Sequence, residues 1–198
     1  MSATSLKGLR TARLLLLSLG LALAWSDHAA AAAPDDSNVC ERQLQAASAS
    51  ENVPIQVLYA VGLTETGRKG KLHPYALNIE GKTVFTTSEA EAMAEFHAAR
   101  KHGKILIDLG CMQINHHFHG REFPSVEAML DPELNVRYAA RFLKTLYARE
   151  GSWSMAVARY HAGPNNNPAQ KRYICAVIGN LVRTGLGNWT PASRKFCR

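Results

Sequence analysis

The sequence predicts a mainly α-helical (α+β) domain with one small β element. Apolar residues recur at helical spacing in several stretches that begin with a capping residue or a proline. Only residues 72–109 combine short β-branched and aromatic runs with glycine-containing turn signals. The 198 residues suit one domain with a short appendage.

The first residues are expected to form a targeting segment. Three basic residues precede an apolar stretch at 14–25 and a run of alanines, an order typical of a secretory signal peptide. We expect cleavage between Ala30 and Ala33, which leaves residues 1–32 as the signal peptide and 38–198 as the domain. An uncleaved anchor is the weaker alternative, because about twelve apolar residues are too few to span a bilayer. The sequence therefore predicts a periplasmic or secreted protein without a stable membrane anchor.

The first two helices of the domain are expected on either side of a break near Pro54. Cys40–Ser50 has the composition of a short helix. Pro54 suits the first turn of the next helix, where its missing N–H costs nothing, and Gly67 provides a C-terminal stop. The apolar residues between them fall on one side of the helix, and Glu65 falls on that same side.

Residues 72–109 are expected to form the β element. We interpret Asn78–Phe85 and Ile105–Leu109 as two strands of a small sheet. A helix that ends near Gly103 is predicted between them, because Ser88 and Glu91 have the spacing of a capping box. The alternative is a surface excursion without a role of its own, and the sequence leaves the role of residues 70–109 open.

The last third of the chain is expected to be helical. One helix begins at Asp131-Pro132, and Ser152 caps the next one after a Gly-Ser break. The stretch "GPNNNP" is a turn by composition. Pro168 begins the last substantial helix, which runs to about Val182.

The charge balance is compatible with an anionic partner, but it does not favour nucleic acid. The net charge is +7, and removal of the leader takes three of the 23 basic and one of the 16 acidic residues. A mildly basic exported protein suits a cell-wall polymer or a membrane surface, although solubility alone explains the charge equally well. No basic run with interleaved aromatics occurs, so nucleic acid is not favoured as a partner.

Four cysteines lie beyond the expected leader, namely Cys40, Cys111, Cys175 and Cys197. An even number in an exported protein indicates two disulfides, for which three connectivities exist. The pairing Cys175–Cys197 gives the shorter loop, and Cys40–Cys111 would then follow, but the sequence leaves the connectivity open. Metal ligation is the weaker alternative, because no CxxC pair occurs.

Glu65 is the candidate catalytic residue. Burying an ionised carboxylate is costly unless it is paired or protonated, so a glutamate on an apolar helix side is expected to have a chemical role. A carboxyl group in apolar surroundings can hold a proton near neutrality and deliver it to a leaving group. A surface position at the helix end is the alternative, and the apolar neighbours of Glu65 argue against it.

Four stretches in order resemble one known family, namely "GLTETG", "GCMQIN", "RYHAGPNN" and "KRY". They are similar to motifs of the soluble-lytic-transglycosylase type of lytic transglycosylase, in the lysozyme-like superfamily. Those motifs are a helix ending in Glu-Ser, a Gly-Leu-Met-Gln-Ile turn, an Ala-Tyr-Asn-Ala-Gly segment and a later tyrosine. The resemblance covers about residues 40–184 and implies a lysozyme-like fold with the β element beside a cleft.

The chain departs from the family pattern at three motif positions and in the spacing between the first two motifs. Thr66 stands for serine, Cys111 for leucine and His161 for asparagine. The 48 positions from Glu65 to Gln113 exceed the usual spacing. In this length the chain resembles versions found beside secretion, conjugation and pilus complexes, which are therefore candidate partners, but the sequence does not name a machine.

The resemblance implies an enzyme that cleaves peptidoglycan between N-acetylmuramic acid and N-acetylglucosamine. Glu65 would act first as the acid and then as the base on the sugar's C6 hydroxyl, which closes a 1,6-anhydro ring. Ordinary glycosidases use two carboxylates. No convincing second carboxylate is found in the sequence, because Glu80 sits at an expected turn and Asp108 lies before a glycine turn.

The same resemblance implies a set of substrate-binding residues, without a cofactor or a metal. Gln113 would bind the sugar, Met112 would line the cleft floor, and Tyr160 and Tyr173 would flank the glutamate. The remaining members are Thr66, His161 and Asn165. Core packing is the alternative for the tyrosines, and a buried turn is the alternative for Gln113 and Met112.

Three other interpretations remain open at this point. A muramidase that uses water would need a positioned water and usually a second acid. A non-catalytic cell-wall binding component of a secretion apparatus would have no need of a buried acid. A secreted toxin would share the chemistry. The histidines of "NHHFHG" are expected to be packing or solvated residues, because their spacing does not place ligands on one helix face.

Overall fold

The computed structural model describes residues 39–163 and 167–198. The expected signal peptide, residues 1–32, and Asn165 of the expected turn lie outside these ranges. The longer helices in the first part are α1 (Val39–Glu51), α2 (Ile55–Glu65) and α3 (Glu89–Lys101). Those in the second part are α6 (Pro132–Glu150), α7 (Trp153–Ala162) and α8 (Asn167–Arg183). The short ones are α4 (His116–His119), η2 (Gly120–Glu122), α5 (Val126–Leu130) and α9 (Pro191–Phe196).

Four short strands form one antiparallel sheet in the order β2-β1-β3-β4. The strands are β1 (Ala76–Ile79), β2 (Lys82–Phe85), β3 (Ile107–Leu109) and β4 (Ile114–Asn115). The helix-dominated fold with a small β element is therefore confirmed. The expected single strand Asn78–Phe85 is wrong in detail, because Glu80 and Gly81 adopt φ of 49° and 92° and turn the chain into a β1–β2 hairpin. Strand β4 was not expected, since two residues are too short for a periodic signal.

Helix caps explain most of the boundaries. Ser88, Ser125, Asp131 and Ser152 each accept a backbone N–H three residues on, as N-caps do. The expected capping box at Ser88 is half formed. The Glu91 side chain accepts from the backbone N–H of Thr87 at 2.8 Å rather than from that of Ser88.

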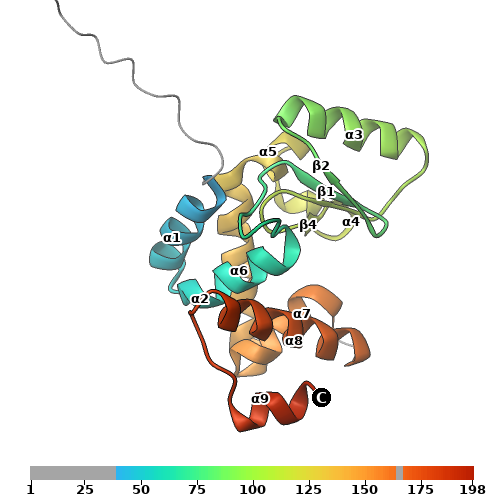
Figure 1. The fold of residues 1–198 in the computed structure, drawn as a ribbon. Coiled ribbons are helices and arrows are strands. Elements are labelled where there is room, and N and C mark those ends of the chain that lie inside the picture. Colours follow the sequence, from blue (N-terminus) through green and yellow to red (C-terminus); the bar gives the residue numbers. More distant parts are fainter. Residues whose placement is uncertain (1–38, 164–166) are drawn as a thin grey trace, which may run out of the picture. The chain divides into compact units, whose positions relative to one another are not determined.

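Helix α6 lies at the centre of the helical packing, where it contacts α1 and α7, while α8 contacts α2 and α7 (Figure 1). The core includes the buried apolar side of α6, with Val136, Ala139, Ala140 and Leu143 fully buried. Hydrophobic burial on this scale is the main stabilising term for such a domain. The strands and α3 lie together on one side of this helical body (Figure 1).

Two disulfides connect Cys40 to Cys111 and Cys175 to Cys197. The first ties α1 to the turn after β3, and the second ties α8 to the end of α9. The sequence left this connectivity open, and the tertiary structure decides it. In the described part of the chain, no helix has the length and apolar character needed to cross a membrane.

Candidate active site

Glu65 is the last residue of α2, and its carboxylate receives a hydrogen bond from α8. The Tyr173 hydroxyl donates to Glu65 Oε1 at 2.5 Å. Helices α2 and α8 pack side by side, which brings together two residues 108 positions apart in the chain. The Glu65 side chain is only 13% exposed. Burial and the adjacent Glu65 charge raise the pKa of Tyr173 well above its usual value, so the phenol remains a donor.

His161 borders the same carboxylate from the end of α7. Its Nδ1 lies 3.8 Å from Glu65 Oε1. Its ring stacks on the Tyr173 ring, with centroids 4.1 Å apart and planes 3° from parallel. The interaction with the Glu65 carboxylate raises the pKa of His161, and burial partly opposes this. The carboxylate of Glu65 therefore lies against a phenol and an imidazole that are stacked on each other.

Asp108 supplies a second carboxylate that interacts electrostatically with this group. It is on β3, and the amide of its cross-strand partner Asn115 donates to it at 2.6 Å. Burial raises the pKa of Asp108 to about 6, and the bond from Asn115 opposes the rise. The charge of Glu65 raises this pKa further and that of His161 lowers it, so Asp108 interacts electrostatically with both residues. Two acidic groups with different surroundings are the arrangement from which acid–base chemistry is built.

The turn after β3 is fixed by a buried amide on α6. Asn135 is fully buried, and its Oδ1 accepts from Met112 N at 2.9 Å. Its Nδ2 donates to the carbonyls of Leu109 and Met129. Gly110 has a φ of +79°, and a Cβ at this position would lie 2.6 Å from Asn135 Nδ2. Only glycine fits there, because both the backbone conformation and the contact exclude a side chain.

Three of the residues expected to contact substrate are buried, two of them within this turn and one against it. Met112 is fully buried, and Thr66 is 2% exposed. The Thr66 hydroxyl donates to the carbonyl of Cys111 at 3.0 Å, which ties the end of α2 to the turn. Gln113 is 9% exposed, and its amide donates to the carbonyls of Ala76 and Gly110. These side chains position the turn next to Glu65, and Met112 and Thr66 are closed off from solvent.

Tyr160 connects α7 to the same turn. Its hydroxyl donates to the carbonyl of Met112 at 2.8 Å, and its ring packs against Phe142. Burial and the charge of Glu65 raise the pKa of Tyr160 well above its usual value. Tyr160 therefore has its hydroxyl directed at the backbone, whereas Tyr173 has its hydroxyl directed at Glu65.

The histidines after β4 have packing contacts. His119 Nδ1 lies 2.8 Å from the Tyr138 hydroxyl, and the His116 ring packs edge-on against Phe96. The His117 ring packs edge-on against Phe118. Among residues 39–163 and 167–198, no three His, Cys, Asp or Glu side chains are grouped to hold a metal ion.

Comparison with known families matches residues 43–176 to the transglycosylase SLT domain. The match spans more than half of the chain and includes Glu65, the turn after β3 and Tyr173. The chain belongs to the transglycosylase SLT domain family. Membership indicates lytic transglycosylase activity in general, with peptidoglycan as the substrate class. No curated protein and no solved structure matches the chain.

Within this SLT domain, the residue that sequence reasoning missed is Asp108. It was set aside because it precedes a glycine turn, yet the pairing of β3 with β4 holds it, partly buried, against Asn115. The available signal was an acidic residue inside a short apolar strand, between Ile107 and Leu109. Its electrostatic interaction with Glu65 depends on how the sheet packs on the helices, which no local pattern encodes.

Proposed function

We propose that this SLT-family protein is an exported peptidoglycan lytic transglycosylase. It cleaves the β-1,4 bond between N-acetylmuramic acid and N-acetylglucosamine and leaves 1,6-anhydro-muramic ends. The observation that carries the proposal is the Glu65 carboxylate at the end of α2, largely buried and hydrogen-bonded by Tyr173. A binding module would have no use for a carboxylate held in this way.

Glu65 acts twice on the reacting sugar. In the first step the protonated carboxyl gives its proton to the leaving oxygen as the C1–O bond breaks. In the second step the carboxylate takes the proton of the C6 hydroxyl while the C6 oxygen bonds to C1. The proton returns to Glu65, so the cycle closes without consuming water. The sugar's N-acetyl group assists while C1 is electron-poor.

Tyr173 and His161 support both charge states of Glu65. The phenol donates to Oε1, which orients the carboxyl group and stabilises the anion left after proton delivery. His161 is half exposed, so its ring edge is available to the substrate as well as to Glu65. Four residues stabilise the turn beside Glu65, namely Gln113, Tyr160 and the buried Met112 and Thr66. Asn165 stays a proposed substrate contact.

Export and partners are part of the same proposal. Two disulfides suit an oxidising compartment, which supports a periplasmic or secreted location. The long segment between Glu65 and Gln113 forms the hairpin and α3, which offers additional surface to a secretion, conjugation or pilus complex. Peptidoglycan glycan strands are the substrate.

A hydrolytic muramidase is the second candidate, and Asp108 is the observation that favours it. A second carboxylate near the acid is what hydrolytic glycosidases use to hold a water or to stabilise the sugar cation. A pKa of about 6 leaves Asp108 largely ionised at neutral pH. The two candidates differ in whether the water or the C6 hydroxyl attacks C1.

Mass spectrometry of the products distinguishes these two reactions. Purified peptidoglycan is incubated with the mature protein, with Glu65→Gln and with Asp108→Asn. We expect products lighter than hydrolytic muropeptides by the mass of one water, and none from Glu65→Gln. Products of full mass that disappear in Asp108→Asn would establish the muramidase. A Glu65→Gln variant that folds and keeps most of the activity would refute the assignment of the acid.

A further inference from the structure

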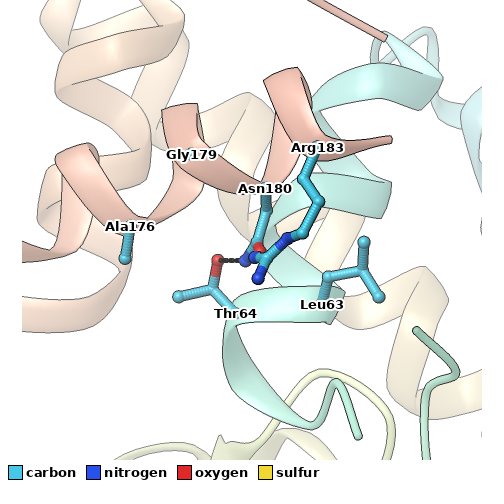
Figure 2. Close-up of a pocket in the computed structure, with 6 residues that line it drawn as sticks. All are labelled: Leu63, Thr64, Ala176, Gly179, Asn180 and Arg183. Atoms are coloured by element: carbon cyan, nitrogen blue, oxygen red, sulfur yellow. Dashed lines mark hydrogen bonds between the residues drawn. The ribbon is translucent and has the colours of Figure 1, made fainter. Parts of the chain in front are cut away.

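A shallow groove runs between α2 and α8, next to the proposed acid. It is lined by Leu63 and Thr64 of α2 and by Ala176, Gly179, Asn180 and Arg183 of α8 (Figure 2). Its volume of about 530 Å³ lies within the range of ligand pockets, roughly 300–1,000 Å³. Thr64 directly precedes Glu65, and Ala176 lies three residues after Tyr173. The groove is therefore adjacent to the Glu65–Tyr173 pair on both helices.

Arg183 gives the groove a positive charge. Figure 2 shows its side chain extending from α8 toward α2, with the guanidinium next to the Asn180 amide. Its guanidinium donates to the neutral Asn180 Oδ1. Within the described residues, no carboxylate lies within ion-pair distance of Arg183. A guanidinium has five donors in a planar fork, so one bond to an amide leaves donors for a carboxylate ligand.

The polar frame of the groove is connected to the end of α2. Asn180 is 6% exposed, and its Nδ2 donates to Thr64 Oγ1 at 2.7 Å. The Thr64 hydroxyl in turn donates to the carbonyl of Ala60 at 2.7 Å. Asn180 therefore has its oxygen on Arg183 and its nitrogen on Thr64, which holds the guanidinium over the junction of the two helices.

We propose that this groove binds a carboxylate of the peptide stem of peptidoglycan, through Arg183, while the attached glycan lies at Glu65. This inference rests on the proposed function, because it concerns the substrate of the same site. In peptide-bearing strands the lactyl carboxyl of muramic acid is in amide linkage, so the sugars are neutral and the free carboxylates belong to the stems. Arg183 lies ten residues beyond Tyr173 on α8, about 15 Å along the helix, a distance that an extended peptide of about five residues spans. Its guanidinium therefore matches the peptide part of the substrate.

Gly179 lets the groove be blocked without disturbing the fold. A Cβ added at this position meets no atom within 4 Å, and its backbone is ordinary helix. A large side chain placed there would extend into the open space of the groove. Gly179→Tyr and Arg183→Gln therefore test the same site by two independent means, one steric and one electrostatic.

The experiment compares two forms of one substrate. Peptide-bearing strands and the same strands freed of stems by an amidase are incubated with the wild-type protein and each variant. Arg137→Gln on α6 is the matched control, because it removes the same charge from an exposed arginine paired with Glu133. We expect both groove variants to lower kcat/KM on peptide-bearing strands about tenfold, the loss typical of one charge-assisted hydrogen bond. On stem-free strands, both are expected to match the wild-type protein.

The outcomes separate this inference from the proposed function. An equal loss on both substrates would overturn the inference. Amidase-treated strands have no stem carboxylates and keep only the lactyl carboxylate on the sugar, so a loss on them could not come from stem binding. Unchanged kcat/KM on both would overturn it as well. If the wild-type protein cleaves neither substrate, the proposed function fails. Co-sedimentation of the variants with the two kinds of strand then tests the groove alone, and weaker binding to peptide-bearing strands only would support it.

Discussion

The charge of Glu65 should control the titration of His161, and Glu65→Gln tests this directly. His161 Nδ1 and Glu65 Oε1 are 3.8 Å apart. Two unit charges at about this distance interact by about 1 kcal/mol in water and about 4 kcal/mol at an effective dielectric constant near 20. The His161 side chain is 47% exposed, so screening by solvent favours the lower value. An interaction of this size favours the protonated imidazole, so the Glu65 carboxylate contributes to the raised pKa of His161.

In Glu65→Gln we therefore expect the pKa of His161 to fall. The remaining influences are burial and Arg172, which lower this pKa, and Asp108, which raises it. The assay is an NMR titration of the histidine side chains, with His161→Asn used to assign the resonance. Glu133→Gln, which makes the same change on α6, is the control. An unchanged His161 pKa in Glu65→Gln would refute the inference that the Glu65 charge raises this pKa.

The same coupling gives stability a defined pH dependence. Because the pKa of His161 is raised in the folded state, its stabilising contribution is complete below the ordinary histidine value. It is lost as the pH rises through the folded-state pKa. Unfolding midpoints of the wild-type protein and His161→Asn should therefore differ more at pH 5 than at pH 8.

Two further predictions concern the phenol at the acid and the disulfides. Tyr173→Phe removes the donor to Glu65 in a closed site, and we expect a loss in kcat of roughly 10- to 100-fold, since hydrogen bonds to charged groups contribute about 1.5–3 kcal/mol. Product release measures it, and an unchanged circular dichroism spectrum shows that the fold persists. Replacing Cys40 and Cys111 by alanine opens a loop of 71 residues and should lower the free energy of unfolding by about 4 kcal/mol. The Cys175–Cys197 loop, with a separation of 22, should cost about 3 kcal/mol. Denaturant unfolding ranks the two, and the reverse order would contradict the loop-closure argument.

Much of the helical architecture could be predicted from the sequence because it depends on neighbours along the chain. Asp131 and Ser152 cap helices at the expected positions. Helix α2 ends at Glu65, two residues before the expected stop at Gly67. The small β element was located correctly but resolved incompletely. Strand β4 has two residues, and the Glu80-Gly81 turn was weighed less than the strand-like residues on either side of it.

The candidate site, too, could be predicted only in part from the sequence. The sequence pointed to Glu65 as the acid and to Tyr173 as its neighbour, and the structure places these two side chains in contact. Burial in the turn was only the alternative for Met112, and burial of Thr66 was not expected, because residues of these types suit a surface as well as an interior. Asp108 was set aside because it precedes a glycine turn, and its hydrogen bond with Asn115 forms only when β3 pairs with β4.

By itself, the sequence determined the longer helices, about where they begin, and which carboxylate lies on an apolar face, but not the short helices α4, α5 and α9. These properties follow from local propensity, capping and periodicity, which act over a few residues. Only the tertiary structure decided the disulfide connectivity, the electrostatic interaction of Asp108 with Glu65 and the groove between α2 and α8. Each of these brings together side chains far apart in the chain, and their meeting depends on how buried surfaces fit together rather than on any local pattern.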